Sequence, residues 1–264
     1  MFDVNLDVAA ATDVGHVRSH NEDSYVAGRH VWAVADGMGG QAAGERASRI
    51  AASCLRERDR QGPLDQTQIV RLIDQANDEI LQYGRSHPAS AGLGTTLTGI
   101  ALTDVGGFAH WLVFNVGDSR VYRLTQGSLI RQTTDHCEAQ ILVDRGLLSP
   151  EEAMHHPRRN VLTRCVGSDR SPHPDIRLIP CAPGDRWLIC SDGLTGEVED
   201  SIVHHILLNA SNSSDASSML VRAALEHGGR DNVTVIVVGI GETSSEPDAG
   251  VIEDTLPRVE VRGS

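Results

Sequence analysis

Three aspartates stand at the ends of apolar stretches of this sequence, where carboxylates from separate segments could meet. They are Asp36 after the run 31–35, Asp192 after the run 187–190, and Asp231 just before the run 233–238. Short apolar runs bounded by turn residues are typical of buried strands. Hard divalent cations such as Mg²⁺ and Mn²⁺ prefer carboxylate and carbonyl oxygens. Gly37, directly after Asp36, lets the backbone turn and brings its carbonyl toward the same ligand.

Each of these aspartates, considered alone, is explained almost as well by a turn. Asp-Gly is a common turn dipeptide, and it occurs both at 36–37 and at 192–193. Asp118, in the tight connection 115–120, is equally explained by turn chemistry. Spacing alone therefore leaves the turns and a metal site open as interpretations.

A polar stretch at 13–25 holds a second group of reactive side chains, Arg18, Glu22 and Asp23. The planar guanidinium of arginine suits a bidentate hold on phosphate or carboxylate. The simpler interpretation of the stretch is a solvated loop, and we keep that interpretation for its histidines.

Apolar periodicity predicts the elements that would position these residues. Apolar stripes predict helices at 41–55 and 69–80, the second with Asp65 and Gln68 as a capping pair and Gly84 as its end. Ser149 followed by Pro150 predicts another helix start. β-prone runs predict a first strand, then an antiparallel meander, then a last group of strands, at 4–12, 96–102, 108–116, 120–124, 129–132, 176–179, 186–191 and 233–240. Two helices are expected near 200–208 and 216–227.

Composition limits the class of protein. The chain has 264 residues and a formal charge of 23 − 36 = −13, which argues against general affinity for nucleic acid or anionic membranes. Five widely spaced cysteines without a CxxC pair indicate reduced thiols rather than a disulfide framework or a zinc site. The N-terminus lacks the features of a signal peptide, and no apolar run approaches the roughly 18–20 residues of a membrane span. We therefore expect a cytoplasmic, unanchored protein.

The last segment, 241–264, differs from the rest of the chain. It is rich in Ser, Pro and Gly and holds six acids and two bases. This composition predicts a disordered acidic tail after a folded domain at 1–240. Thr255 lies among acids there, so we hypothesise that a kinase phosphorylates it and a phosphothreonine-binding module docks on it. The alternative is an inert tail.

Several motifs together resemble the ordered motif set of the type 2C metal-dependent protein phosphatases, in particular the bacterial members. The resemblance runs from about residue 5 to 240 and rests on Arg18-x-x-Asn21-Glu22-Asp23, Asp36-Gly-Met-Gly-Gly40, Gly94-Thr-Thr96, Asn115-Val-Gly-Asp-Ser-Arg120, Asp135-His136, Asp192-Gly193 and Asp231-Asn232. It implies an α+β fold, a four-layer αββα sandwich of two mainly antiparallel sheets flanked by helices. The predicted strands and amphipathic helices are compatible with that layering.

The resemblance also implies a role for each matching residue. Asp36 would bridge two Mn²⁺ or Mg²⁺ ions, which the carbonyl of Gly37, Asp192 and Asp231 would also bind. Asp118 and Asp192 would together bind a third, weaker ion. Arg18 would bind the substrate phosphate, Glu22 and Asp23 would order water at the metal site, and Asn232 would be a supporting neighbour. The segment 144–164 resembles the flap of the bacterial members, although a plain surface excursion fits its sequence too.

The implied activity is metal-dependent hydrolysis of phosphoserine and phosphothreonine in proteins, which would reverse bacterial Ser/Thr kinases, by a monomer. Met38 departs from the eukaryotic pattern, which has a histidine there as proposed proton donor, and a thioether cannot donate a proton. Water at the metal site is favoured as the donor over His136. Alternatives are a catalytically weak or dead binding module, or a specialised phosphatase with one protein substrate.

Overall fold

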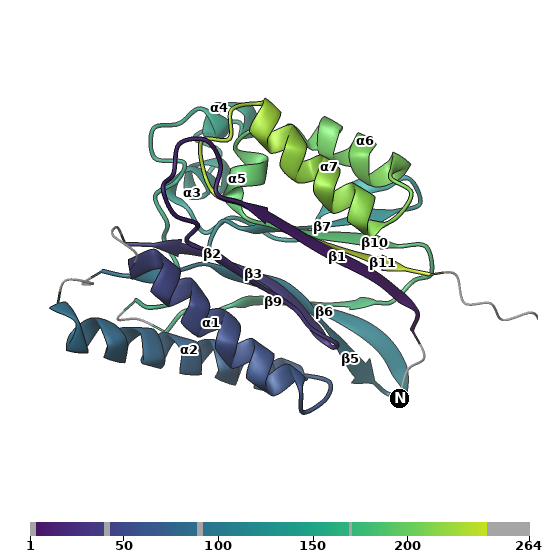
Figure 1. Cartoon of the computed structure of the whole chain (residues 1–264), viewed down its shortest axis with the longest axis horizontal. Helices are drawn as coiled ribbons and strands as arrows, with labels where there is room; N and C mark the ends of the chain where they lie inside the picture. Colours follow the sequence, from purple (N-terminus) through teal and green to yellow (C-terminus); the bar gives the residue numbers. More distant parts are fainter. Residues whose placement is uncertain (1–3, 40–42, 89–91, 169–170, 242–264) are drawn as a thin grey trace, which may run out of the picture.

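The computed structural model describes residues 4–39, 43–88, 92–168 and 171–241. Two antiparallel sheets lie face to face, and helices cover their outer faces (Figure 1). The first sheet contains, in spatial order, β1 (Leu6–Asp13), β11 (Val233–Ile240), β10 (Arg186–Cys190), β7 (Arg120–Thr125) and β8 (Ser128–Arg131).

The second sheet is built from strands of the first half of the chain and one later strand. Its order is β2 (Asp23–Ala27), β3 (Val31–Met38), β5 (Leu97–Val105), β6 (Phe108–Val116) and β9 (Asp175–Pro180), with β4 (Gly94–Thr95) paired to β3. The predicted meander is wrong at one point, because β6 and β7 belong to different sheets. The connection at 117–119 carries the chain from one sheet to the other and places Asp118 between them.

Two long helices cover the second sheet, α1 (Ala43–Asp59) and α2 (Gln66–Ser86). The predicted capping pair of α2 is confirmed, since the Asp65 carboxylate accepts from the Gln68 N–H at 2.8 Å and the Gln68 amide oxygen accepts from the Asp65 N–H at 2.9 Å. The predicted end at Gly84 is wrong. The helix continues to Ser86 and closes on His87, because a single glycine lowers helix stability by only about 1 kcal/mol.

The first sheet is covered by α6 (Asp200–Asn209) and α7 (Ser213–Glu226), close to the predicted positions (Figure 1). Three short helices lie in the connections: α3 (Glu138–Asp144), α4 (Pro150–Met154) and α5 (Asp192–Thr195). The predicted start of α4 is confirmed, with Ser149 and Glu152 forming a complete capping box.

Three separate apolar clusters hold the four layers together. One joins α1 and α2 to the second sheet, one joins α6 and α7 to the first sheet, and one fills the space between the sheets. The middle cluster contains Trp32, Trp111 and Trp187, whose neighbouring ring centroids lie 5.6 and 5.8 Å apart. The predicted α+β, four-layer αββα sandwich is thus confirmed.

Two negative findings concern the described part of the chain. All five cysteines are free thiols, as predicted. Among the helices in the described ranges, none is long and apolar enough to cross a membrane. The predicted tail at 242–264, including Thr255, lies outside the described residues.

Candidate metal centre

Asp36 lies on β3 near the end where the strand leaves the sandwich. The prediction that this strand ends at Asp36 is wrong. The strand continues to Met38, because Gly37 and Met38 pair with β4. The backbone of Asp36 is fixed on both sides: its N–H donates to the Thr96 hydroxyl at 2.9 Å, and its carbonyl accepts from the Thr96 N–H at 2.9 Å. The position of the Asp36 carboxylate is therefore set by the strands rather than by a flexible turn.

Gly37 lies within β3 rather than in the predicted turn, and it is required for close packing. A Cβ atom at Gly37 would lie 2.1 Å from the carbonyl oxygen of Gly44, at the start of α1. Only a residue without a side chain lets strand and helix approach this closely. The contact brings the first turn of α1 against the site.

Asp23 lies directly opposite Asp36 in the β2–β3 pairing, so the two side chains share one face of the sheet. Its Oδ2 atom accepts a hydrogen bond of 2.8 Å from the hydroxyl of Ser191, which directly follows β10 of the other sheet. Its Oδ1 atom is buried and has no hydrogen-bond partner. A buried carboxylate oxygen without a partner is costly in a native structure and indicates a missing ligand.

Asp192 is the first residue of α5, immediately after β10. It approaches the 231–232 segment closely, since a Cβ atom at the neighbouring Gly193 would lie 1.9 Å from the carbonyl oxygen of Asn232. Ser191 ties the same two segments together, because its N–H donates to the Thr234 carbonyl and its hydroxyl accepts from the Thr234 N–H. Glycine and serine thus bring two of the predicted ligands to adjacent positions.

Asn232 anchors the loop that carries Arg18 and Glu22. Its side-chain amide donates to the carbonyls of Val14 and His20, each at 2.9 Å, and its side-chain oxygen accepts from the Glu22 N–H at 2.8 Å. The predicted supporting position of Asn232 is therefore observed. The Glu22 carboxylate itself makes no hydrogen bond or ion pair with the residues that the structure describes.

Arg18 reaches across this loop to the end of β11. Its Nη2 atom lies 2.7 Å from Oδ2 of Asp231, and the side chains are 52% and 34% exposed. The hydrogen bond to Asp231 raises the pKa of Arg18. The guanidinium is thus held at the rim of the carboxylate group and remains open to solvent.

The connection that holds Asp118 is fixed from two sides. The N–H of Gly117 donates to Nδ1 of His136 at 3.1 Å, and the carbonyl of Gly117 accepts from the His136 N–H at 2.9 Å. On the other side, the hydroxyls of Ser119 and Thr96 lie 2.8 Å apart, which links this connection to the backbone of Asp36.

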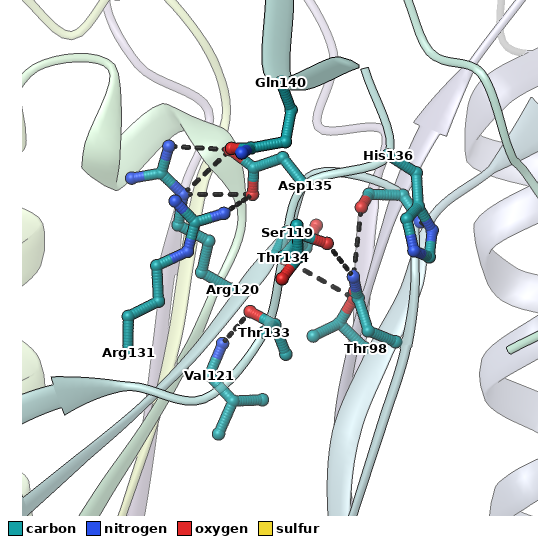
Figure 2. Close-up of polar contacts among 12 residues, drawn as sticks. Thr98, Ser119, Arg120, Val121, Arg131, Thr133, Thr134, Asp135, His136 and Gln140 are labelled. Atoms are coloured by element: carbon teal, nitrogen blue, oxygen red, sulfur yellow. Dashed lines mark hydrogen bonds and ion pairs between the residues drawn. The ribbon is translucent and has the colours of Figure 1, made fainter. Parts of the chain in front are cut away.

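Arg120 and Arg131 converge on the carboxylate of Asp135 in a largely buried charge cluster (Figure 2). Asp135 accepts from Nε and Nη2 of Arg120, the shortest bond being 2.8 Å, and from Arg131. Asp135 thus accepts from both arginines and fixes the position of Arg120. The positive charge of Arg120 favours the ionised form of Asp118. The sequence motif predicted Asp135 and His136 as a pair but not these supporting roles.

The carboxylates influence one another strongly. Burial, together with the neighbouring Asp192 and Asp231, raises the pKa of Asp23 to about 7. Burial, together with Asp23, Asp192 and Asp118, raises the pKa of Asp36 well above its usual range, and burial also raises the pKa values of Asp118 and Asp192. These aspartates come from separate segments of the chain, so the fold concentrates negative charge in one place.

This arrangement fits a divalent cation. The donors are hard oxygens, burial and mutual repulsion raise the pKa values of Asp23, Asp36 and Asp192, and one Asp23 oxygen is buried without a partner. Within the described ranges, no three acidic, histidine or cysteine side chains already converge as a complete ligand set. Asp36 and Asp192 instead repel each other as neighbouring carboxylates, a repulsion that a cation would relieve.

The segment 144–164 is attached at its base and otherwise exposed. The Glu138 N–H donates to the Val161 carbonyl at 2.9 Å, and the Thr163 N–H donates to the His136 carbonyl at 2.8 Å. The end of the segment is therefore paired with residues 136–138, which contact the Asp118 connection through His136. Its role as a flap stays a prediction.

Residues that the sequence did not single out complete the site: Ser191, Thr234 and Arg131. Only Ser191 had a signal, because a hydroxyl directly before an Asp-Gly pair at a strand end can bridge to the neighbouring strand. Arg131 and Thr234 act across the fold, so local sequence gave no signal for them.

Comparison with known proteins finds relatives along most of this chain. The family model described as protein phosphatase 2C matches residues 15–226. The serine/threonine protein phosphatase PstP of Mycobacterium tuberculosis is 38% identical over 237 residues, which cover 89% of this chain but only 45% of PstP. The serine/threonine phosphatase stp of Listeria monocytogenes is 33% identical over 249 residues, which cover 90% of this chain and 97% of that protein.

Solved structures agree as well. The crystal structure of the M. tuberculosis PstP phosphatase superimposes with a TM-score of 0.83 at 37% identity, over 90% of this chain and 99% of that one. A crystal structure of the PstP catalytic domain in complex with two manganese ions gives a TM-score of 0.81 at 36% identity, over 90% of this chain and 99% of that one.

Proposed function

This chain belongs to the protein phosphatase 2C family, and we propose that it hydrolyses phosphoserine and phosphothreonine in proteins with the help of divalent metal ions. The observation that carries the proposal is the cluster of Asp23, Asp36, Asp192 and Asp231, with the raised pKa values of the first three and the unpartnered Asp23 oxygen. The relative PstP, crystallised with two manganese ions, supports the metal requirement.

Two ions, Mn²⁺ or Mg²⁺, would be held by Asp36, the Gly37 carbonyl, Asp192 and Asp231, and Asp118 would contribute with Asp192 to a third. When bound, such ions neutralise the phosphate dianion and lower the pKa of the attacking water. The protein provides the fixed carboxylates: β3 holds Asp36, α5 begins with Asp192, and Asp231 lies in the loop just before β11.

Arg18 would bind the phosphoryl oxygens of the substrate. It lies at the rim of the cluster, is 52% exposed, and has the planar donor geometry that matches phosphate. The guanidinium would then donate hydrogen bonds to the phosphate in place of, or beside, its present hydrogen bond to Asp231. Glu22 and Asp23 would orient water, and the free Oδ1 atom of Asp23 is the acceptor available for this.

Among the described residues, neither Met38 nor His136 is free to protonate the leaving alkoxide. Met38 carries a thioether, which has no proton to donate. Both ring nitrogens of His136 are engaged, Nδ1 by the Gly117 N–H and Nε2 by Asp175 at 3.0 Å. Burial also lowers the pKa of His136, so the ring is neutral at physiological pH. We therefore assign the proton to water.

The partners follow from the proposed chemistry. Substrates would be proteins phosphorylated by bacterial Ser/Thr kinases, and a net charge of −13 supports neither nucleic acid nor anionic membranes as ligands. We propose that residues 1–240 form the catalytic domain, that the chain acts as a cytoplasmic monomer, and that Thr255 is a phosphorylation site. A dead binding module is less favoured, because such a module has no chemical need for the complete set of aspartates.

The experiment is the release of phosphate from a phosphothreonine peptide by purified protein, with EDTA, Mg²⁺ and Mn²⁺ in parallel. We expect turnover only with metal, and none in Asp231→Asn. Turnover in EDTA, or full metal-dependent turnover in the variant, contradicts the proposed mechanism.

A further inference from the structure

A groove lined by arginines lies at the end of the sandwich opposite the carboxylate site. Its volume is about 530 Å³, and its walls are the β2–β3 hairpin, with Arg29, and the last turn of α1, with Arg56 and Arg60. β2 starts at Asp23 in the carboxylate site and ends at Ala27 in the groove. The two sites are therefore the two ends of one strand.

The groove has a defined shape because the buried Asp59 holds its two walls together. The Asp59 carboxylate accepts from the backbone N–H groups of Arg29, His30 and Val31, at 2.9, 2.7 and 3.1 Å. Gly28 permits this contact, since a Cβ atom there would lie 2.6 Å from the carboxylate. Asp59 thus bonds to the backbone of the hairpin and not to the three guanidinium groups.

The guanidinium groups are available to a ligand. Within the described part of the chain, none of the three has a carboxylate within ion-pair distance, and Arg56 is held only by a bond of 2.8 Å to the Tyr25 carbonyl. All three residues are exposed. Three unpaired cations around one groove form a local positive site on a chain of net charge −13. Guanidinium clusters of this kind suit phosphate, through charge and paired N–H donors.

We propose that this arginine groove binds a second phosphoryl group of a protein substrate while the carboxylate site holds the phosphoryl group to be hydrolysed. The inference rests on the proposed phosphatase function and adds a preference for multiply phosphorylated substrates.

The fold sets the spacing between the two phosphoryl groups. Four steps along β2 separate Asp23 from Ala27, which is about 14 Å at roughly 3.4 Å per residue. An upper value for the distance between the two sites comes from α1, which begins beside Gly37 and ends at Asp59. Its 17 residues span about 25 Å. An extended peptide covers this range with about four to eight residues.

The test compares three phosphothreonine peptides. One carries no second phosphate, one carries a non-hydrolysable phosphonate two residues away, and one carries it eight residues away. We expect KM to be about tenfold lower for the eight-residue spacing than for the other two, with kcat unchanged. At about 1 M salt, where the Debye length is roughly 3 Å, the preference disappears.

The matching variant is the double substitution Arg29→Glu and Arg60→Glu, because neither side chain makes a hydrogen bond or ion pair within the described residues. It abolishes the KM preference and leaves the hydrolysis of p-nitrophenyl phosphate unchanged. The control is Arg222→Glu on α7, where the arginine side chain is also exposed, at 67%. This control keeps the preference.

Equal KM values for the three peptides, or a preference that survives in the double variant, overturn the assignment. A preference that appears only after removal of residues 242–264 also overturns it, because the acidic residues of that segment would then be the ligand of the groove in the full chain. Failure of the proposed function looks different, because no peptide and no p-nitrophenyl phosphate would be hydrolysed with any metal.

Discussion

Arg18 donates a hydrogen bond of 2.7 Å to Asp231, so the side chain proposed to bind phosphate is paired with a proposed metal ligand. Replacing Arg18 by Ala removes a charge-assisted hydrogen bond to substrate, worth about 2 kcal/mol, and lowers kcat/KM about 30-fold. Because the pair is exposed, the free energy of unfolding changes by no more than about 1 kcal/mol. Steady-state kinetics and urea unfolding measure both. An unchanged kcat/KM removes Arg18 from the site.

The carboxylate cluster predicts an unusual pH dependence for metal-free protein. The pKa of Asp23 is about 7 in the folded chain and close to 3.8 in the unfolded one, so the native state binds more protons between these values. The stability contribution is fully present below pH 4 and is lost as the pH rises through 7.

We expect EDTA-treated protein to lose stability from pH 5 to 8 relative to Asp23→Asn, in which this position does not titrate. Thermal unfolding at several pH values measures the difference, and Mn²⁺ reduces it. A constant difference between the two proteins across this range contradicts the raised pKa.

Gly37→Ala tests the close approach between β3 and α1. The new Cβ atom would lie 2.1 Å from the Gly44 carbonyl, and relief of that overlap costs about 3 kcal/mol. The matched control is Gly239→Ala, also in a strand, where the nearest atom would be 3.6 Å away. We expect urea unfolding to show a large loss of stability for the first variant and little change for the second. Equal effects contradict the packing role.

His136 is expected to position the Asp118 connection rather than to transfer a proton. His136→Asn keeps an acceptor for the Gly117 N–H, and His136→Ala leaves that buried group without a partner, at a cost of about 1–3 kcal/mol. The alanine variant should therefore be less stable, while both variants keep the shape of the wild-type pH–rate profile. Loss of one limb of that profile in both variants identifies His136 as the acid.

The features that were predicted correctly from the sequence are local ones. Asp65 with Gln68, and Ser149 with Glu152, form caps within four residues, so their chemistry is complete in the sequence. The division of the strands between two sheets was missed, because β6 and β7 look like neighbours in the chain and pairing depends on distant partners.

The site shows the same division. The aspartates and Arg18 were singled out because they match the motif order of the family that the sequence resembles. The bond from Ser191 to Asp23 joins residues 168 positions apart, and the clamp of Arg120 and Arg131 on Asp135 forms only when two strands pair. Such contacts decide the pKa values and the geometry of the site, and no local pattern contains them.

The most direct test of the metal centre is a titration of Mn²⁺ into metal-free protein, with calorimetric stoichiometry and phosphopeptide turnover measured on the same samples. The wild-type chain should bind at least two ions, and turnover should rise with their occupancy. Asp192→Asn should lose at least one ion and nearly all turnover while it keeps its thermal unfolding transition. Full turnover in Asp192→Asn, or turnover in wild-type protein that bears no relation to metal occupancy, would contradict the account.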